Sequence, residues 1–341
     1  MTSQLYIRQQ WYVLAWSHEL ANGPLARTVM EQPIVVFRTE GGSVAALEDR
    51  CCHRAMPLSM GAVVGEHIRC VYHGLEFDCQ GRCARIPGQE AIPKGFAVRR
   101  YPVVERDRMV WVWMGNPDGA QLQSIPAYPF HDDLEKWHTA YDMVPFACNY
   151  ELIHDNLLDL THLAYVHPHT IGGNAGAHFG AEMTITEDAQ GLHVRRWMPG
   201  SVPPPTYALS VPLADRVDRW QEVHFRPGLV LNYSGAVNAG EDPGAGGGYR
   251  ARNLNALTPE TATTTHYFFS ASHGHRLDDP DWTRQHFEQI KKTFMEDYTI
   301  LMRQQLSISC SPERELRVVL ADRAAARSRQ LVQAAILHEA G

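Results

Sequence analysis

Residues 49–83 read DRCCHRAMPLSMGAVVGEHIRCVYHGLEFDCQGRC, and this stretch decides how the chain is interpreted. It holds a Cys-x-His pair, Cys51 and His53, and a Cys-x-x-His pair, Cys70 and His73. Five of the seven cysteines in the 341-residue chain lie in this stretch. Clustering of thiols with imidazoles at these spacings is typical of a metal site.

Two kinds of metal site use these ligands. A Rieske [2Fe–2S] cluster has two thiolates on one iron and two neutral imidazoles on the other, so each motif would supply one of each. A structural Cys₂His₂ zinc site uses the same ligand types. Zinc fingers, however, usually pair Cys with Cys and His with His and end in a helix, so mixed pairs on β-hairpins favour the cluster. Cys52 has the wrong spacing and is expected to pack nearby as a small thiol, and Cys79 and Cys83 are expected to be structural.

The sequence around these motifs predicts a small all-β domain. Short runs rich in Val, Ile, Trp and Phe are separated by glycines and prolines, without a long helical period. The expected strands lie at residues 11–15, 34–38, 44–48, 68–71 and 109–114. The turn sequence GNPDG at residues 115–119 interrupts this pattern, so the first domain is expected to span residues 1–118.

Residues 119–341 mix helical and strand patterns, so the chain is predicted to be α+β with a second, catalytic domain here. Helices are expected at residues 150–166, where Pro168 ends the first, 282–305 and 323–339. Strands are expected at residues 220–225, 229–233 and 265–271. The glycine-rich stretch 239–248 is predicted to be a flexible linker, and 170–180 either a lid over a site or a surface loop.

Composition excludes several classes of protein. Hydrophobic residues are 44% and charged residues 20%, which is ordinary for a globular protein, and the net charge of −7 gives no reason to expect nucleic acid or an anionic membrane as partner. No apolar run approaches the roughly 18 residues of a membrane span, and the N-terminus lacks a secretion signal. A cytoplasmic location is therefore expected, where an odd number of cysteines makes a disulfide framework improbable.

A second group of potential ligands lies in NYELIHDNLLDLTHLAYVHP, residues 149–168. On a continuous helix Asp155, Asp159 and His162 would share one face, and His167 would follow where the chain turns. Two histidines so placed can bind one metal ion. His154 would lie on a different face and is expected not to be a ligand.

A third ligand would complete a 2-His-1-carboxylate triad, which leaves coordination positions open for O₂. Asp297 falls on the apolar face of the predicted helix 282–305, together with Phe287, Ile290, Phe294 and Leu301. A carboxylate there is costly unless it is paired or metal-bound, so Asp297 is predicted to be the third ligand, with a core salt bridge as the alternative. Glu296 is rotated by about 100° and is expected to be solvated.

These motifs resemble those of the Rieske non-haem iron oxygenases. Residues 49–83 resemble the cluster domain, 149–168 the catalytic-iron motif, and FMEDYTIL at 294–301 the distal aspartate segment. With LTPETATTTHYFF at 257–269, the resemblance covers nearly the whole chain. It is strongest to the oxygenase components of the vanillate O-demethylase, dicamba O-demethylase and toluenesulfonate methyl-monooxygenase group. Most members of the family have Pro where this chain has Cys52.

The resemblance implies a helix-grip catalytic domain, in which an antiparallel sheet wraps on long helices, and a head-to-tail homotrimer. Each subunit would hold one [2Fe–2S] cluster and one mononuclear Fe(II), with O₂ as co-substrate. The cluster of one subunit would face the iron of its neighbour. Asp159 would bridge the two centres, accepting hydrogen bonds from His73 across the interface and from His162, and Asn156 is a second catalytic candidate. Because no dinucleotide-binding glycine fingerprint is present, an NADH-dependent flavin/iron–sulfur reductase, alone or with a ferredoxin, would supply electrons.

The leading functional hypothesis is oxidation of the methoxy carbon of a small aromatic acid, that is, O-demethylation with release of formaldehyde. The alternatives are an aryl-methyl or aromatic-ring hydroxylase and, outside the enzymes, a Rieske electron-transfer protein. A carrier would end near residue 120 and would not need the second ligand group. The candidate substrate anchors, each of which could instead be an ordinary strand or surface residue, are His224, Arg226, Asn232 and Asn255, with His178 and Tyr165 expected at the border of the pocket.

Overall fold

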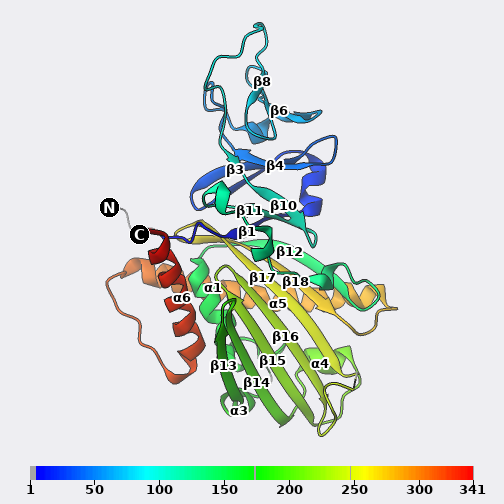
Figure 1. Ribbon diagram of the computed structural model, residues 1–341. Coiled ribbons are helices and arrows are strands. Elements are labelled where there is room, and N and C mark those ends of the chain that lie inside the picture. Colours follow the sequence, from blue (N-terminus) through cyan, green and yellow to red (C-terminus); the bar gives the residue numbers. More distant parts are fainter. Residues whose placement is uncertain (1–4, 173, 246, 341) are drawn as a thin grey trace. The chain divides into compact units, whose positions relative to one another are not determined.

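The computed structural model describes residues 5–172, 174–245 and 247–340, and the chain forms two compact units (Figure 1). The first comprises the described residues of Met1–Ala127, with Thr258–Ala262 and the end of the chain from Glu339. The second comprises Tyr128–Leu257 and Thr263–His338. The first unit therefore extends past residue 118, because the segment that follows packs back on it: Trp11 Nε1 donates to the Gln121 carbonyl (3.1 Å) and Arg106 to the Ile125 carbonyl (3.2 Å).

The first unit is built from three small antiparallel sheets. The first sheet has the strand order β1 (Trp11–Trp16), β11 (Met109–Trp113) and β10 (Val103–Arg106). The second has β2 (Leu25–Val29), β3 (Gln32–Arg38), β4 (Val44–Glu48) and β9 (Arg100–Tyr101). The third has β5 (Ala62–Val64), β6 (His67–Arg69), β7 (Glu76–Asp78) and β8 (Cys83–Arg85). Strands β1 and β11 are buried over their whole length and are rich in Trp and Val, which favour strand structure. The prediction of β structure here is confirmed.

The second unit is dominated by a seven-stranded antiparallel sheet. Its order is β12 (His138–Phe146), β18 (Thr264–His273), β17 (Tyr249–Thr261), β16 (Leu229–Asn238), β15 (Val217–Arg226), β14 (Gly191–Ser201) and β13 (Glu182–Asp188). The 31-residue helix α5 (Pro280–Cys310) packs on β12 and β18. An antiparallel sheet with a long helix across it agrees with the predicted α+β class and the helix-grip architecture.

The predicted helix over residues 150–166 is wrong in one respect, because it is broken at Asp159. Helix α1 (Tyr150–Leu158) ends there, Asp159 is extended with φ −100° and ψ 96°, and a 3₁₀ turn at Leu160–His162 leads into α2 (Leu163–Val166). The Asp159 carboxylate accepts from Thr161 N (2.9 Å) and so starts the new turn. Asp155 and His162 therefore do not share one helix face, and Asp155 instead pairs with Arg329 of α6 (Arg323–Ala340).

The remaining helices are short. Helix α3 (Ala175–Phe179) lies in the segment predicted as lid or loop, and α4 (Pro205–Ser210) connects β14 and β15. The predicted linker 239–248 joins β16 to β17. Gly246 of this linker and Gly173 of the segment predicted as lid or loop lie outside the described residues. None of the helices in the described part of the chain has the length and apolar character that a membrane crossing requires.

Candidate metal centres

The two Cys/His motifs of the first unit lie on two loops with the same backbone hydrogen bonds. Cys51 N donates to Met56 O (2.8 Å), and Cys70 N donates to Leu75 O (2.8 Å). The residue four positions after each cysteine donates back to it, Ala55 N to Cys51 O (2.9 Å) and Gly74 N to Cys70 O (3.1 Å). Both of these residues have positive φ, 55° and 72°. The two motifs thus present a cysteine and a histidine from equivalent turns.

The donors divide into buried thiols and exposed imidazoles. Cys51 and Cys70 are each 2% exposed and belong to the hydrophobic core of this unit. His53 and His73 are exposed and meet edge to face, with ring centroids 4.6 Å apart. Burial raises the pKa of the Cys51 thiol to about 11, so a metal ion is needed to hold it as a thiolate. Two buried sulfurs and two surface nitrogens on paired loops fit a Rieske cluster.

The other cysteines of this region lie outside the donor set. Cys52 is exposed, so the expectation that it packs as a small thiol is wrong. Cys83 is buried in the same core as Cys51, and Cys79 packs partly against it. Their structural role agrees with the expectation from the sequence.

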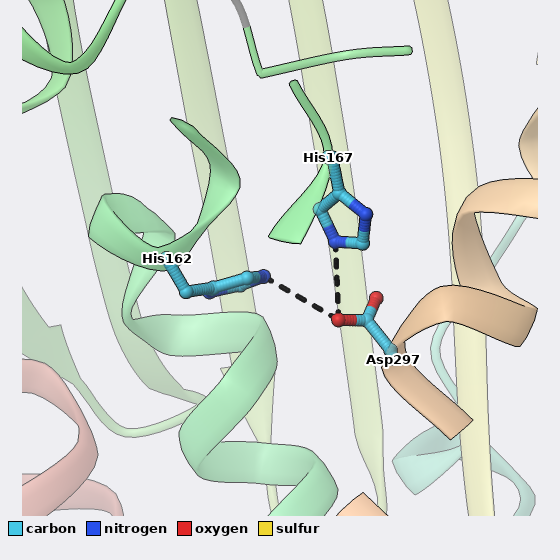
Figure 2. A group of neighbouring side chains, drawn as sticks. All are labelled: His162, His167 and Asp297. Carbon is cyan, nitrogen blue, oxygen red and sulfur yellow. Dashed lines mark hydrogen bonds and ion pairs between the residues drawn. The ribbon is translucent and has the colours of Figure 1, made fainter. Parts of the chain in front are cut away.

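In the second unit, His162, His167 and Asp297 converge (Figure 2), and their donor atoms all lie within 4.8 Å of one another. Asp297 Oδ1 is 3.1 Å from His167 Nε2 and 3.6 Å from His162 Nε2. Metal–nitrogen and metal–oxygen bonds of about 2.0–2.2 Å put adjacent ligand atoms about 3 Å apart, so one ion fits among the three donors. Among the described residues, no other group of three His, Cys, Asp or Glu side chains converges in this way.

In each histidine of this group, a hydrogen bond made by Nδ1 fixes the orientation of the ring. His167 Nδ1 donates to Glu296 Oε2 (2.7 Å), and His162 Nδ1 donates to the main-chain carbonyl of Asp159 (2.5 Å). With a metal ion bound among the three side chains, both Nε2 atoms would lose any proton and serve as its ligands. The sequence reasoning missed Glu296: it is not simply solvated, because its helix places it on the opposite side of the same imidazole from Asp297.

Asp159 and Asn156 also contact this group. Asn156 Nδ2 donates to Asp297 Oδ1 (2.9 Å) and lies 3.4 Å from His162 Nε2. The Asp159 carboxylate accepts from Thr161 N and from Thr161 Oγ1 (2.7 Å) through its Oδ1. His162 therefore contacts the backbone of Asp159, whereas the sequence analysis expected it to contact the carboxylate.

Electrostatics differ between the two histidines. Burial lowers the pKa of His162 despite the nearby Asp297 carboxylate. Burial would also lower the pKa of His167, but the hydrogen bonds and charges of Asp297 and Glu296 outweigh it and raise that pKa. His154 is elsewhere: it is buried, its Nε2 accepts from Gly228 N (3.1 Å), and burial lowers its pKa to about 3. It is not part of the ligand group, as expected.

A cavity opens on two of the three converging side chains, His162 and Asp297. It contains about 670 Å³ of non-atom space, part of it open to solvent, and His162, Asp297 and Asn156 form part of its wall. The sheet contributes a row of amides and hydroxyls: Gln221, Asn232, Ser234, Asn253, Asn255 and Tyr249. Apolar side chains close the rest: Leu157, Leu160, Leu163, Ile171, Ile290 and Phe294.

Only two of the six predicted substrate contacts lie in this wall. Asn232 and Asn255 line it, and Tyr267 Oη donates to Asn255 Oδ1 (2.7 Å). His224 and Arg226 do not line it, because side chains alternate along β15 and the cavity side carries Gln221.

His178 and Tyr165 are likewise absent from the wall. His178 is fully buried, with Nε2 2.5 Å from Gly172 O, whereas Tyr165 is 70% exposed. The predicted pocket roles of His224, Arg226, His178 and Tyr165 are therefore wrong for this cavity. Gln221, Ser234 and Asn253 were missed, since nothing in the sequence tells which strand face a polar residue occupies.

Comparison with known proteins agrees with both centres. The Rieske [2Fe-2S] domain family matches residues 10–102, and the vanillate O-demethylase oxygenase C-terminal domain family matches residues 146–338. The chain is 37% identical to the iron–sulfur subunit of a toluene-4-sulfonate monooxygenase system of Comamonas testosteroni, over 99% of both chains. It is 36% identical to the oxygenase component of dicamba O-demethylase of Stenotrophomonas maltophilia, over 81% of both.

Solved structures show the same fold. Crystalline dicamba monooxygenase bound to dicamba matches with a TM-score of 0.90 and 32% identity, covering 98% of this chain and 99% of that one. A further structure of dicamba monooxygenase contains non-haem iron and matches with a TM-score of 0.80. The fold, the two family matches and the two groups of donor side chains all support the same family assignment. The chain belongs to the Rieske non-haem iron oxygenases and is the terminal oxygenase of a Rieske monooxygenase system, which uses a [2Fe–2S] cluster, a mononuclear non-haem iron and O₂.

Proposed function

We propose that the two donor sets hold the two iron centres of this oxygenase. His162, His167 and Asp297 would bind the mononuclear iron, and the cluster would be bound by Cys51, His53, Cys70 and His73. The observation that carries the proposal is the convergence of two imidazoles and one carboxylate beside a cavity that His162 and Asp297 help to line.

The reaction proposed is hydroxylation of the methoxy carbon of a small aromatic acid. One oxygen atom of O₂ enters the C–H bond and the other leaves as water, with two electrons and two protons consumed. The resulting hemiacetal breaks its C–O bond to the methyl-derived carbon and gives a phenol and formaldehyde. The iron, when bound, supplies O₂ activation at open coordination positions, and the cluster relays electrons to it one at a time.

The residues of the chain then have separate tasks. Glu296 and the Asp159 carbonyl fix the His167 and His162 rings so that both Nε2 atoms would be directed at an iron ion bound beside Asp297. Asn156 donates to Asp297 Oδ1 and so fixes the carboxylate. Apolar residues such as Leu160 and Phe294 exclude water from the reacting carbon, and the amides of Asn232 and Asn255 are placed to orient polar groups of the substrate.

Asp159 is proposed to link the centres of neighbouring subunits in a head-to-tail homotrimer. Its Oδ1 is engaged by Thr161, and its Oδ2 has the second acceptor position that His73 of a neighbour would use. The link to His162 runs through the main-chain carbonyl of the same residue. Both contacts therefore depend on the helix break at Asp159.

A separate reductase is proposed as the electron source. The relatives carry the names of iron–sulfur subunits and oxygenase components of larger systems, which supports a multicomponent arrangement. We propose an NADH-dependent flavin/iron–sulfur reductase, alone or with a ferredoxin. Purified oxygenase with NADH alone is then expected to form no product, and substantial turnover without a reductase would contradict this.

Hydroxylation of an aryl methyl group is a second candidate reaction. It is supported by the 37% identity to the subunit of a toluene-4-sulfonate monooxygenase system. The same iron chemistry would act on a methyl carbon attached to the ring, and the alcohol product would be stable.

The test is product analysis with the reconstituted enzyme. The purified protein is loaded with iron, supplied with a surrogate Rieske-oxygenase reductase and NADH, and incubated with panels of methoxybenzoates and methylbenzenesulfonates. Formaldehyde in one-to-one ratio with a phenol supports O-demethylation, whereas a benzylic alcohol without formaldehyde supports the second candidate. Three iron atoms per chain are expected. Two iron atoms per chain and no oxidation of either panel would contradict both the proposed iron site and the proposed reaction.

A further inference from the structure

Two arginines occupy inward positions of the large sheet where strand alternation calls for apolar residues. Alternate residues on one face of β14 are buried, Leu192, Val194, Arg196 and Met198, and so are those on one face of β15, Val217, Arg219, Gln221, Val223 and Phe225. Arg196 is 4% exposed and Arg219 is 2% exposed. Arg196 pairs with Gln221 in the β14–β15 register and Arg219 with Met198, so the two guanidinium groups extend from diagonal positions on one face.

Neither guanidinium has a carboxylate partner within ion-pair distance among the described residues, although the Asp159 carboxylate acts on Arg196 from farther away and opposes the lowering of its pKa by burial. Arg219 donates to the Ile171 carbonyl (3.1 Å) and is 3.5 Å from the Gly172 carbonyl, and Arg196 donates to the His178 carbonyl. The Nε atoms of both arginines are buried without a hydrogen-bond partner. Two buried positive charges with unused donors are costly unless an anion balances them.

The pair borders the substrate cavity. Arg219 lies 4.9 Å from the centre of the Tyr207 ring and bonds to Ile171, and both of these residues line the cavity. Arg196 is paired in the strand register with Gln221, which also lines the cavity and whose Oε1 has no hydrogen-bond partner. By contrast, no Lys or Arg side chain belongs to the described lining itself, and the predicted anchors His224 and Arg226 are absent from it.

We propose that Arg196 and Arg219 form the subsite for the anionic group, a carboxylate or sulfonate, of the aromatic substrate. The proposal rests on the proposed function above and names its substrate class. A guanidinium offers a planar fork of donors that matches carboxylate and sulfonate oxygens, and charge-assisted bonds of this kind are the strong ones. The anionic group would lie at the Tyr207 and Ile171 side of the cavity, and the carbon to be oxidised would face Asp297.

The experiment measures binding and needs no turnover. Iron-loaded protein without reductase is titrated by calorimetry with 4-methylbenzenesulfonate and 4-methoxybenzoate and with their neutral counterparts, 4-methylbenzenesulfonamide and 4-methoxybenzamide. Wild-type protein is expected to bind each anion at least about tenfold more tightly than its neutral counterpart. R219Q and R196Q should each lose about tenfold for the anions and less than about threefold for the neutral molecules.

Two further variants separate charge from position. R195Q changes the neighbouring arginine of β14, which is exposed and pairs with Glu222, and it should leave all affinities unchanged. R219K keeps the charge and should retain most of the preference for anions. If R219Q lowers the affinity for anions and neutral molecules equally, the arginine only holds the carbonyls of residues 171 and 172, and the proposal is wrong.

The ratio of the wild-type affinities for an anion and its neutral counterpart tests the subsite by itself, even where a variant fails to fold. Equal affinity for the anion and its neutral counterpart would refute the subsite. Inorganic sulfate that binds as tightly as the arenesulfonate would show a site for free anions only, which would also refute the proposal. Failure of the proposed reaction appears separately. Preference for the anions without any oxidation product would support the subsite and refute the proposed reaction. Product formed only from neutral arenes would support the oxidation and refute the subsite.

Discussion

The proposed cluster ligands of this oxygenase lie close together in the sequence, whereas the proposed ligands of the mononuclear iron lie far apart. The four cluster donors lie between Cys51 and His73 on two turns with the same hydrogen bonds, and their imidazoles are exposed. In the triad, His167 and Asp297 are 130 positions apart and both are buried. A local site is specified by turn geometry, whereas a distant one depends on the packing of one helix against the end of another. Variants that affect one centre and spare the other test this difference.

The largest effect is expected from Asp297→Ala. Asp297 Oδ1 is the one carboxylate oxygen near both Nε2 atoms, so its removal should abolish binding of the mononuclear iron while the cluster loops fold unchanged. Iron content should fall from three atoms to two per chain, and product formation by at least about 10³-fold. The visible absorbance of the cluster should stay. Loss of that absorbance as well would show that the two centres do not fold independently.

Asp159→Asn should separate electron transfer from metal binding. The amide oxygen can still accept from Thr161 N, so the helix break and the His162 contact to the main-chain carbonyl should persist. Both metal centres are then expected at full occupancy, with product formation lowered about 100-fold because the negative charge between centres is lost. The measurements are iron content, cluster absorbance and product yield. Near-normal yield with an intact cluster would refute the bridging role.

Glu296→Ala should weaken the triad without removing a ligand. His167 Nδ1 would lose its acceptor, and loss of such a partner typically lowers metal affinity about 10- to 100-fold. Glu296→Gln keeps an acceptor oxygen and should lie between this variant and wild type. Competition with an iron chelator measures the affinity. Glu288→Gln, an exposed glutamate on the same helix, is the control, and an equal loss there would assign the effect to general charge.

The smallest effects are expected in the cluster loops, at two equivalent positions with positive φ. Gly74 has φ 72°, and a Cβ there would lie 3.1 Å from Pro87 Cγ, so Gly74→Ala should lower the free energy of unfolding by about 1–2 kcal/mol. Ala55 carries a Cβ at φ 55° already, so Ala55→Gly should be neutral or stabilising by up to about 1 kcal/mol. Urea unfolding followed by cluster absorbance measures both. A stabilising Gly74→Ala or a clearly destabilising Ala55→Gly would mean that the two loops are not equivalent.

The sequence predicted the cluster ligands from spacing alone, because both motifs lie on short turns whose geometry is local. It also predicted Asp297, since a carboxylate on the apolar face of a long helix needs a partner. It could not predict Glu296, because a rotation of about 100° along α5 moves a side chain away from one neighbour and toward another. It also missed the break at Asp159, where the helical period continues although the side chain begins a new turn.

Strand alternation on β15 shows the same limit in the cavity. Both faces of this strand carry polar residues and both carry aromatic ones, so the pattern did not tell whether Gln221 or His224 faces the iron. Only the pairing of β15 with β14 and β16, and the position of α5, fixed that choice. It placed Gln221, Asn232 and Arg219 on the inner side of the sheet.

The sequence by itself determined the family and the α+β class, and it predicted the cluster ligands, because these depend on residue types at short, fixed spacings. The tertiary structure decided which side chains hold the two imidazoles, which strand face forms the cavity, and that two arginines are buried beside it without an ion-pair partner among the described residues. The physical reason is that orientation depends on contacts between segments far apart in the chain, and residue spacing carries no record of those contacts.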